Sequence, residues 1–377
     1  MILFNSPSFE GRELEYIEQA VIGQHTSGNG PFTQRAEALL DRLHDGGTTL
    51  LTTSCTHALE LCARLLDLEP GDEVIVPAYT FVSSASAFLL YGARPVFVDV
   101  RHDTLNLSPE AVEAAITPRT RAVCAVHYAG VGAEPEQLAD LARRHDLTLI
   151  EDNAHGLFAR YDGRPLGTFG ALSTLSFHET KNITCGEGGA VHVNDAGLVE
   201  RAEILREKGT DRSRFLRGEV DKYTWVDVGS SWAMADLLAA ALTAQLEESD
   251  RIQSRRHHIW ARYQDELASW AHDQGVVTPT IPAECEHSAH MYHLRLPSLE
   301  QRGGFIAHLR ERGVQAVFHY QSLHLSRVGE RLGGRAGQFP VTEAASDTLV
   351  RLPLHTSLSD DDQSVVLDAV RSFQVRS

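Results

Sequence analysis

The feature that most constrains the fold of this chain is an alternation of short apolar runs and helical patterns between residues 48 and 152. The runs at 48–53 and 147–151 are short and apolar, and the segments between such runs place apolar residues at helical spacing. This alternation is typical of an α/β fold in which helices cover both faces of a buried, mostly parallel sheet. Two further strands are expected at 171–177 and 188–194.

The last third of the chain has a different pattern. Helical spacing predominates from Ala233 to about Trp270, and the following segments mix expected strands at 291–296 and 314–320 with helices. A chain of 377 residues is also long for one compact domain. We therefore expect a large α/β domain with an N-terminal arm over residues 1–250 and a small α+β domain over residues 251–377.

Composition excludes several classes of protein. The formal charge of −17 argues against a partner that is nucleic acid or an anionic membrane. No apolar run approaches the roughly 18 residues of a membrane span, and the N-terminus lacks a signal-peptide pattern, so a cytoplasmic protein is expected. The five cysteines lack CxxC spacing, which argues against disulfides and a zinc site, and no metal site is expected.

One lysine stands out because the chain has only three: Lys181, Lys208 and Lys222. Lys181 lies in the run SFHETKN between the two strands expected at 171–177 and 188–194. A lysine in a pocket of an acidic α/β protein is suited to form a Schiff base with an aldehyde cofactor. Pyridoxal phosphate would also need a carboxylate for its ring nitrogen, an anion site for its phosphate and a flat apolar group beside its ring.

Each of these requirements has a candidate, and each candidate has an ordinary structural alternative. Asp152 ends an apolar strand, where a carboxylate could face a ligand or could equally cap a turn. Ser54 and Thr56 begin an expected helix, where free N–H groups favour a phosphate or merely mark an N-cap. Tyr79 or Phe81 could lie against the ring or belong to the core.

The sequence also resembles a known family over nearly its whole length. The runs TSCTHALE, PGDEVIVPAYTFVSSASA, IEDNAHG, SFHETKN and GEGGA are similar to those of the DegT/DnrJ/EryC1 sugar aminotransferases, which are fold-type I pyridoxal-phosphate enzymes. Within that group, SFHETKN together with REKGT and GSS resembles the dTDP-4-amino-4,6-dideoxygalactose transaminases.

The resemblance implies a role for individual residues around the cofactor. Lys181 would bind the cofactor covalently and shuttle the proton, and Asp152 would bind the pyridine nitrogen. His155 would lie near the phenolic oxygen, and Phe81 would stack on the ring. The residues implied to hold the phosphate are Ser176, Cys55 and Thr56.

The resemblance also implies a partner subunit and a sugar pocket. Ser231 occupies a position from which relatives reach the phosphate of the partner subunit, so a homodimer with shared sites is expected. The residues implied to border the sugar are Gly28, Gly30, Pro31, His319 and Tyr320.

The activity implied is transfer of an amino group from L-glutamate to the C4 ketone of a dTDP-4-keto-6-deoxyhexose, giving a dTDP-4-amino-4,6-dideoxy sugar. Alternatives within the family are aminotransferases that act on a C3 ketone, a 4-keto pentose or an inosose. A deoxysugar dehydratase is disfavoured because such relatives carry histidine where Lys181 stands. A non-enzymatic regulator with the same fold would be expected to lose Lys181 or Asp152, and both are present.

Overall fold

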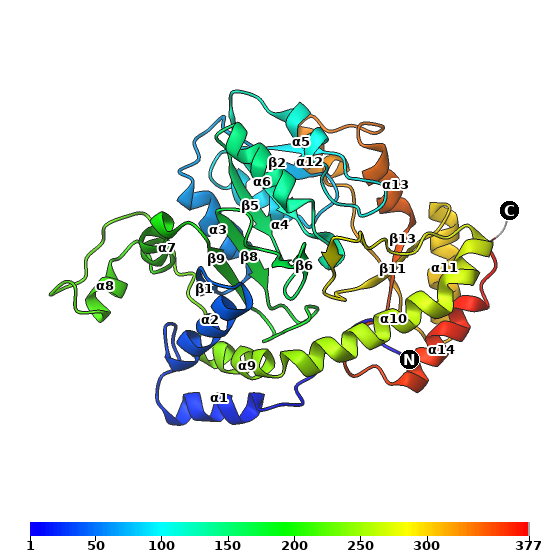
Figure 1. Cartoon of the computed structure of the whole chain (residues 1–377), viewed down its shortest axis with the longest axis horizontal. Helices are drawn as coiled ribbons and strands as arrows, with labels where there is room; N and C mark the ends of the chain where they lie inside the picture. Colours follow the sequence, from blue (N-terminus) through cyan, green and yellow to red (C-terminus); the bar gives the residue numbers. More distant parts are fainter. Residues whose placement is uncertain (376–377) are drawn as a thin grey trace.

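A computed structural model describes residues 1–375 of the chain and places a seven-stranded sheet at its centre (Figure 1). The strand order is β1-β9-β8-β5-β4-β2-β3. Strands β2 to β5 and β8 pair in parallel, whereas β9 pairs antiparallel with both β1 and β8. The expected mostly parallel sheet is therefore confirmed. Its strands are β1 (Thr48–Thr52), β2 (Glu73–Pro77), β3 (Arg94–Val98), β4 (Thr120–Val126), β5 (Thr148–Asp152), β8 (Leu172–Ser176) and β9 (Gly189–Val193).

Helices cover both faces of this sheet because successive side chains of a strand point to opposite sides. Val74 and Val76 pack in a cluster with α3 and α4, whereas Ile75 packs in another cluster with α5 and α6. Likewise Leu50 faces α3, and Leu51 joins the cluster of α2 and α9. The helices of this part are α1 (Glu13–Ile22), α2 (Pro31–Leu43), α3 (Cys55–Leu65), α4 (Ser83–Leu89), α5 (Pro109–Ala115), α6 (Pro135–Arg144), α7 (Val199–Arg206), α8 (Arg212–Leu216) and α9 (Asp236–Glu247).

A second hydrophobic cluster lies around an antiparallel sheet of order β11-β13-β12. Helix α10 runs from the large sheet to this sheet, and α11 and α14 pack beside it (Figure 1). Ile2 forms a bridge to Val314, so the first residues of the chain pair with this C-terminal part. The domain division at residue 250 stays a prediction. The elements are α10 (Ser249–Gln274), β11 (Tyr292–Arg295), α11 (Leu299–Glu311), β12 (Val317–Phe318), α12 (Arg327–Arg331), α13 (Pro340–Thr348), β13 (Leu349–Leu352) and α14 (Asp360–Arg371).

Several short elements were not anticipated from the sequence because two or three residues carry no periodic pattern. A small sheet of order β10-β6-β7 pairs two strands that lie between β5 and β8 in the sequence with a strand more than a hundred residues later. Within residues 1–375, no helix has the length and apolar character that crossing a membrane requires. The short elements are β6 (Arg160–Tyr161), β7 (Arg164–Pro165), β10 (Cys285–Glu286) and the 3-10 turns η1 (Tyr128–Gly130), η2 (Ala196–Leu198) and η3 (Leu323–Leu325).

The carboxyl ends of the parallel strands meet at one edge of the large sheet, which is where ligands bind in open α/β sheets. Strand β1 leads there directly into α3, and β5 ends there with Asp152. Strand β8 ends there with Ser176, one residue before the loop that carries Lys181. The topology thus brings residues from distant parts of the sequence to one place.

A glycine in β9 permits the close approach of α3 to this edge, which gives a test of the packing. A Cβ atom at Gly189 would overlap the backbone of Ser54 and Cys55 at the start of α3. We expect Gly189→Ala to lower the free energy of unfolding by about 1–3 kcal/mol, because backbone atoms must move. Denaturant unfolding measures the change.

The matched control is Gly303→Ala in α11, where an added Cβ would meet no atom of the described residues within 4 Å. This substitution should be neutral or stabilise the protein by up to about 1 kcal/mol, because alanine favours a helix interior. Equal stability of the Gly189→Ala variant and the wild-type protein would contradict the described packing.

Candidate active site

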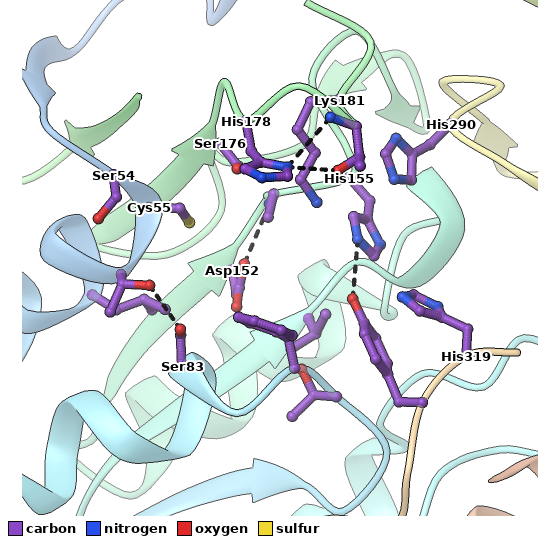
Figure 2. Close-up of a pocket in the computed structure, with 18 of the residues that line it drawn as sticks. Ser54, Cys55, Ser83, Asp152, His155, Ser176, His178, Lys181, His290 and His319 are labelled. Carbon is purple, nitrogen blue, oxygen red and sulfur yellow. Dashed lines mark hydrogen bonds between the residues drawn. The ribbon is translucent and has the colours of Figure 1, made fainter. Parts of the chain in front are cut away.

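A cavity of about 540 Å³ lies at the carboxyl edge of the large sheet. Figure 2 shows Ser54, Cys55 and Ser83 on one side of it and His155, His290 and His319 on the other, with Asp152 between them. Ten residues singled out from the sequence line this cavity together: Ser54 at the start of α3 and nine others. The nine others are Cys55, Thr56, Phe81, Asp152, His155, Ser176, Lys181, His319 and Tyr320.

Lys181 reaches the cavity from the loop between β8 and β9. Its backbone N–H donates to the carbonyl of His178 at 2.9 Å, which holds the loop in a tight turn. Within the described part of the chain, its Nζ makes no hydrogen bond and no ion pair. Burial lowers the pKa of Lys181 to about 8, although the nearby Asp152 acts in the opposite direction. A substantial fraction of the amine is therefore neutral near physiological pH, and neutral amines are nucleophiles and bases.

Asp152 is held facing the cavity by two hydrogen bonds. The Ser84 hydroxyl donates to its Oδ2 at 2.7 Å, and the Ala154 N–H donates to its Oδ1 at 3.3 Å. Burial raises the pKa of Asp152, whereas these hydrogen bonds and Lys181 favour the charged form. A buried carboxylate of this kind is suited to pair with a protonated ring nitrogen.

The preceding acid, Glu151, has a structural role on the other face of β5. Its carboxylate accepts N–H groups of Gly167 and Gly170 at 2.8 and 2.7 Å and contacts His127 Nε2 at 2.9 Å. The alternation of side chains along a strand separates the two acids, so that only one of them, Asp152, lines the cavity.

The start of α3 forms the opposite wall of the cavity. Ser54 caps the helix by accepting the N–H of His57 at 3.1 Å. Within residues 1–375, the N–H groups of Cys55 and Thr56 find no acceptor, so they remain free for a ligand. Burial raises the pKa of the Cys55 thiol, which keeps it neutral. Free N–H groups and the helix dipole together favour a phosphate here, with the Ser176 hydroxyl beside them.

His155 presents a neutral imidazole to the cavity. The N–H of Ala129 donates to His155 Nδ1 at 3.4 Å, which places the ring proton on Nε2, 3.5 Å from the Tyr320 hydroxyl. Burial lowers the pKa of His155 well below its ordinary value. The ring stacks on His290 with a centroid distance of 4.2 Å. His155 can therefore donate a hydrogen bond to an oxygen atom without carrying a charge.

The two aromatic residues after β2 have different roles. Phe81 lines the cavity and is 53% exposed, so its ring is free to contact a ligand. Tyr79 is fully buried and donates its hydroxyl hydrogen to the His319 carbonyl. The Tyr320 N–H in turn donates to the Tyr79 oxygen at 2.9 Å. Tyr79 therefore fixes the segment that brings His319 and Tyr320 to the cavity.

Four residues implied by the resemblance do not line this cavity. Gly28 lies against Ala233, and Gly30 is the residue before α2. Pro31 is exposed at the first position of α2, and the exposed Ser231 forms a backbone bridge with Glu207. Their assignment to a sugar pocket or to a partner's phosphate site stays a prediction.

Sequence reasoning missed one buried residue that supports Asp152, and two residues of the cavity wall. Ser84 belongs to a run of small residues, which gave no signal for a contact with Asp152. His290 and Arg351 lie more than a hundred positions after Lys181 and reach the cavity from the C-terminal sheet region. No local pattern could have found them, because only the packing of this region against the large sheet brings them near.

Comparison with known proteins agrees with this geometry. The sequence profile of the DegT/DnrJ/EryC1/StrS aminotransferase family matches residues 7–371. The chain belongs to this family. It is 32% identical over 352 residues to the spore coat polysaccharide biosynthesis protein SpsC of Bacillus subtilis, covering 91% of this chain and 90% of SpsC.

Two solved structures have the same fold. The aminotransferase TlmJ from Streptoalloteichus hindustanus has a TM-score of 0.90 at 32% identity, covering 99% of this chain and 98% of TlmJ. Spr1654 from Streptococcus pneumoniae, a candidate sugar aminotransferase, was solved with the PMP form of the cofactor and has a TM-score of 0.91 at 28% identity, covering 99% and 98% of the two chains. The expected fold-type I architecture is confirmed.

Pyridoxal phosphate is the cofactor of this family, so the cofactor predicted from the sequence is also confirmed. The residues that line the cavity fit pyridoxal phosphate. An amine without a partner, a buried carboxylate and free N–H groups at a helix start surround one cavity. These are the chemical partners that an aldehyde, a pyridine nitrogen and a phosphate require.

The lowered pKa of Lys181 gives a test on protein freed of cofactor. Only the neutral amine attacks an aldehyde. We therefore expect the rate of covalent pyridoxal phosphate capture to rise with pH and to level off above a midpoint near the pKa of about 8. Stopped-flow absorbance at several pH values measures this rate, and Lys181→Ala is the control. A midpoint near 10.5, the ordinary lysine value, would contradict the described burial.

Proposed function

We propose that this protein transfers the amino group of L-glutamate to the C4 ketone of a dTDP-4-keto-6-deoxyhexose, giving a dTDP-4-amino-4,6-dideoxy sugar. The observation that carries the proposal is the amine of Lys181 in one cavity with Asp152. This amine has a pKa of about 8 and no hydrogen bond or ion pair within residues 1–375. Family membership supports the aminotransfer. The choice of sugar rests on the runs SFHETKN, REKGT and GSS, which resemble those of one subgroup of the family.

The walls of the cavity would hold the cofactor at three points. When bound, pyridoxal phosphate supplies the electron sink that makes a carbon–hydrogen bond beside the transferred nitrogen acidic. Asp152 would keep the ring nitrogen protonated, and its hydrogen bond from Ser84 favours the charged carboxylate that this requires. The N–H groups of Cys55 and Thr56, with the Ser176 hydroxyl, would bind the phosphate.

Lys181 would move the proton in both half-reactions. Its Nζ would take the proton from the α-carbon of L-glutamate in the first half and deliver a proton to C4 of the sugar in the second. A pKa of about 8 suits both tasks, because a group titrating near the working pH can accept and release a proton.

The neighbouring side chains would orient the reactants. The Nε2–H of His155 would donate to the phenolic oxygen of the cofactor, and the exposed ring of Phe81 would cover the cofactor face. His319 and Tyr320 border the same cavity and would contact the sugar. Gly28, Gly30 and Pro31 of the N-terminal arm are likewise proposed to border the sugar, although they do not line this cavity.

A homodimer is part of the proposal. Ser231 is exposed and lies outside the cavity of its own chain, so it is placed to serve a second one. The preceding segment exposes several large apolar side chains, which a partner subunit would cover. They are Leu216, Tyr223, Trp225, Val226 and Val228.

The visible absorption of the bound cofactor tests the activity. We expect the absorption of the purified protein to fall on addition of L-glutamate and to return on addition of dTDP-4-keto-6-deoxyglucose. If the absorption falls with L-glutamate but does not return with the keto sugar, the protein is an aminotransferase that uses a different acceptor. No response to any amino donor would reject the proposed function.

Lys181→Arg serves as the decisive variant in the same assay. Arginine keeps the positive charge but remains protonated, so it cannot act as a base. We expect turnover to fall by at least about 10³-fold, in line with the loss of an essential general base and nucleophile. Lys208→Arg is the control, because Lys208 is exposed and pairs with Glu207 at 3.2 Å. Substantial turnover by the Lys181→Arg variant would contradict the mechanism.

Mixing two inactive variants tests the shared site. Ser231→Glu should repel the phosphate bound in the partner subunit, whereas Lys181→Ala inactivates the cavity of its own chain. A mixed dimer regains one complete site, so subunit exchange in an equal mixture should restore about a quarter of the wild-type activity. Absence of restored activity in mixed dimers separated by affinity tags would contradict the role of Ser231.

A further inference from the structure

Arg351 is a cation in the cavity wall without a partner. It lies on β13, opposite His293 of β11 and Val317 of β12, and its side chain lines the cavity. Within residues 1–375, no carboxylate lies within 4.0 Å of its guanidinium, and its Nε is buried without a hydrogen-bond acceptor. The ring of Phe4 covers the guanidinium at 4.5 Å.

Two buried arginines of this protein, in contrast, have polar partners. Arg206 pairs with Glu37 at 2.6 Å, and Arg256 donates to the carbonyls of Ala289 and His290 at 3.2 and 2.6 Å. Burial lowers the pKa of Arg351, yet a guanidinium stays protonated at neutral pH. A buried charge without a partner is costly, so its retention in a cavity wall indicates that an anion completes the site.

We propose that Arg351 binds the α-carboxylate of the amino donor through paired N–H···O hydrogen bonds. This inference rests on the proposed aminotransfer and names the residue that recognises the donor. A planar guanidinium matches a carboxylate with two parallel hydrogen bonds, which also fixes the orientation of the bound molecule.

Position favours the carboxylate over the other anion that the reaction involves, the diphosphate of the sugar nucleotide. The α-carboxylate is bonded to the carbon that exchanges its proton with Lys181, so its cation must lie near Lys181. Arg351 meets this condition, because Arg351 and Lys181 line the same cavity and the charge of Arg351 acts on the pKa of Lys181. A diphosphate on C1 of the hexose lies across the sugar ring from the reacting C4.

The two half-reactions should therefore depend differently on Arg351. L-Glutamate carries a carboxylate beside its reacting carbon, whereas the keto sugar carries only uncharged carbon groups there. The acids that line the cavity, Asp152 and Glu187, do not neutralise Arg351 when a donor is absent, because neither forms an ion pair with it. The same cavity can then accept both substrates in turn.

The experiment measures each half-reaction separately on holoenzyme carrying Arg351→Gln. We expect the concentration of L-glutamate that gives half the maximal fall in visible absorption to rise by roughly 10- to 100-fold, the loss typical of a hydrogen-bonded charge pair. The concentration of dTDP-4-keto-6-deoxyglucose needed for the return should change by less than about 3-fold. Arg351→Lys keeps the positive charge but lacks the paired N–H groups of a guanidinium, so it should give an intermediate half-maximal L-glutamate concentration.

The matched control is Arg295→Gln. Arg295 is buried and, like the half-buried Arg351, forms no ion pair among the described residues. It lies on the neighbouring strand β11 but does not line the cavity. Its substitution should change the half-maximal L-glutamate concentration by less than about 3-fold, even if it lowers thermal stability.

Three results would overturn the inference. The first is an unchanged response of Arg351→Gln and Arg351→Lys to L-glutamate. The second is a selective weakening of the keto-sugar half-reaction, which would assign Arg351 to the diphosphate. The third comes from calorimetric titration with glutarate, a dicarboxylate that cannot react. Equal binding of glutarate by the wild-type and Arg351→Gln holoenzymes would contradict the proposal, and so would the absence of binding by the wild type. Because the glutarate titration needs no turnover, it tests carboxylate binding by Arg351 even if the proposed reaction is wrong.

Discussion

Parallel pairing of β4, β5 and β8 is the constraint on which the site depends. Because parallel strands end at the same edge, Asp152 at the end of β5 and Ser176 at the end of β8 lie beside each other, with the start of α3 opposite. The antiparallel strand β9 then returns the chain along β8 and leaves Lys181 in the connecting loop. Gly189 permits this return, since any larger residue there would overlap the start of α3.

Burial of this edge sets the charges of the cavity. It lowers the pKa of Lys181 to about 8 and lowers the pKa of His155 and His290 well below the ordinary histidine value. The histidines are therefore neutral hydrogen-bonding groups, and the charges that remain on the walls belong chiefly to Asp152, Arg351 and the protonated fraction of Lys181. In the proposed mechanism, Lys181 therefore transfers the proton, whereas Arg351 and the N–H groups of α3 bind anions.

Much of the fold could be predicted because its signals are local. The strand at 147–151 and the helix after Ser54 appear in the structure within a residue or two of their expected limits, since apolar periodicity identifies elements of this length. The elements β6, β7 and β10 escaped prediction because two residues carry no period. The role of Tyr79 was also open, and only its burial and its hydrogen bond to the His319 carbonyl decided it.

The sequence alone determined the chemistry: a rare lysine in SFHETKN, an acid at the end of a strand and a helix start with polar residues indicated pyridoxal phosphate and its family. Only the tertiary structure decided which groups share the cavity. It separated Asp152 from Glu151, placed Ser84 behind Asp152, added His290 and Arg351 to the cavity wall, and left Ser231 outside. The physical reason is that residue type is a local property, whereas burial, pKa and the lack of a partner arise from contacts between distant segments.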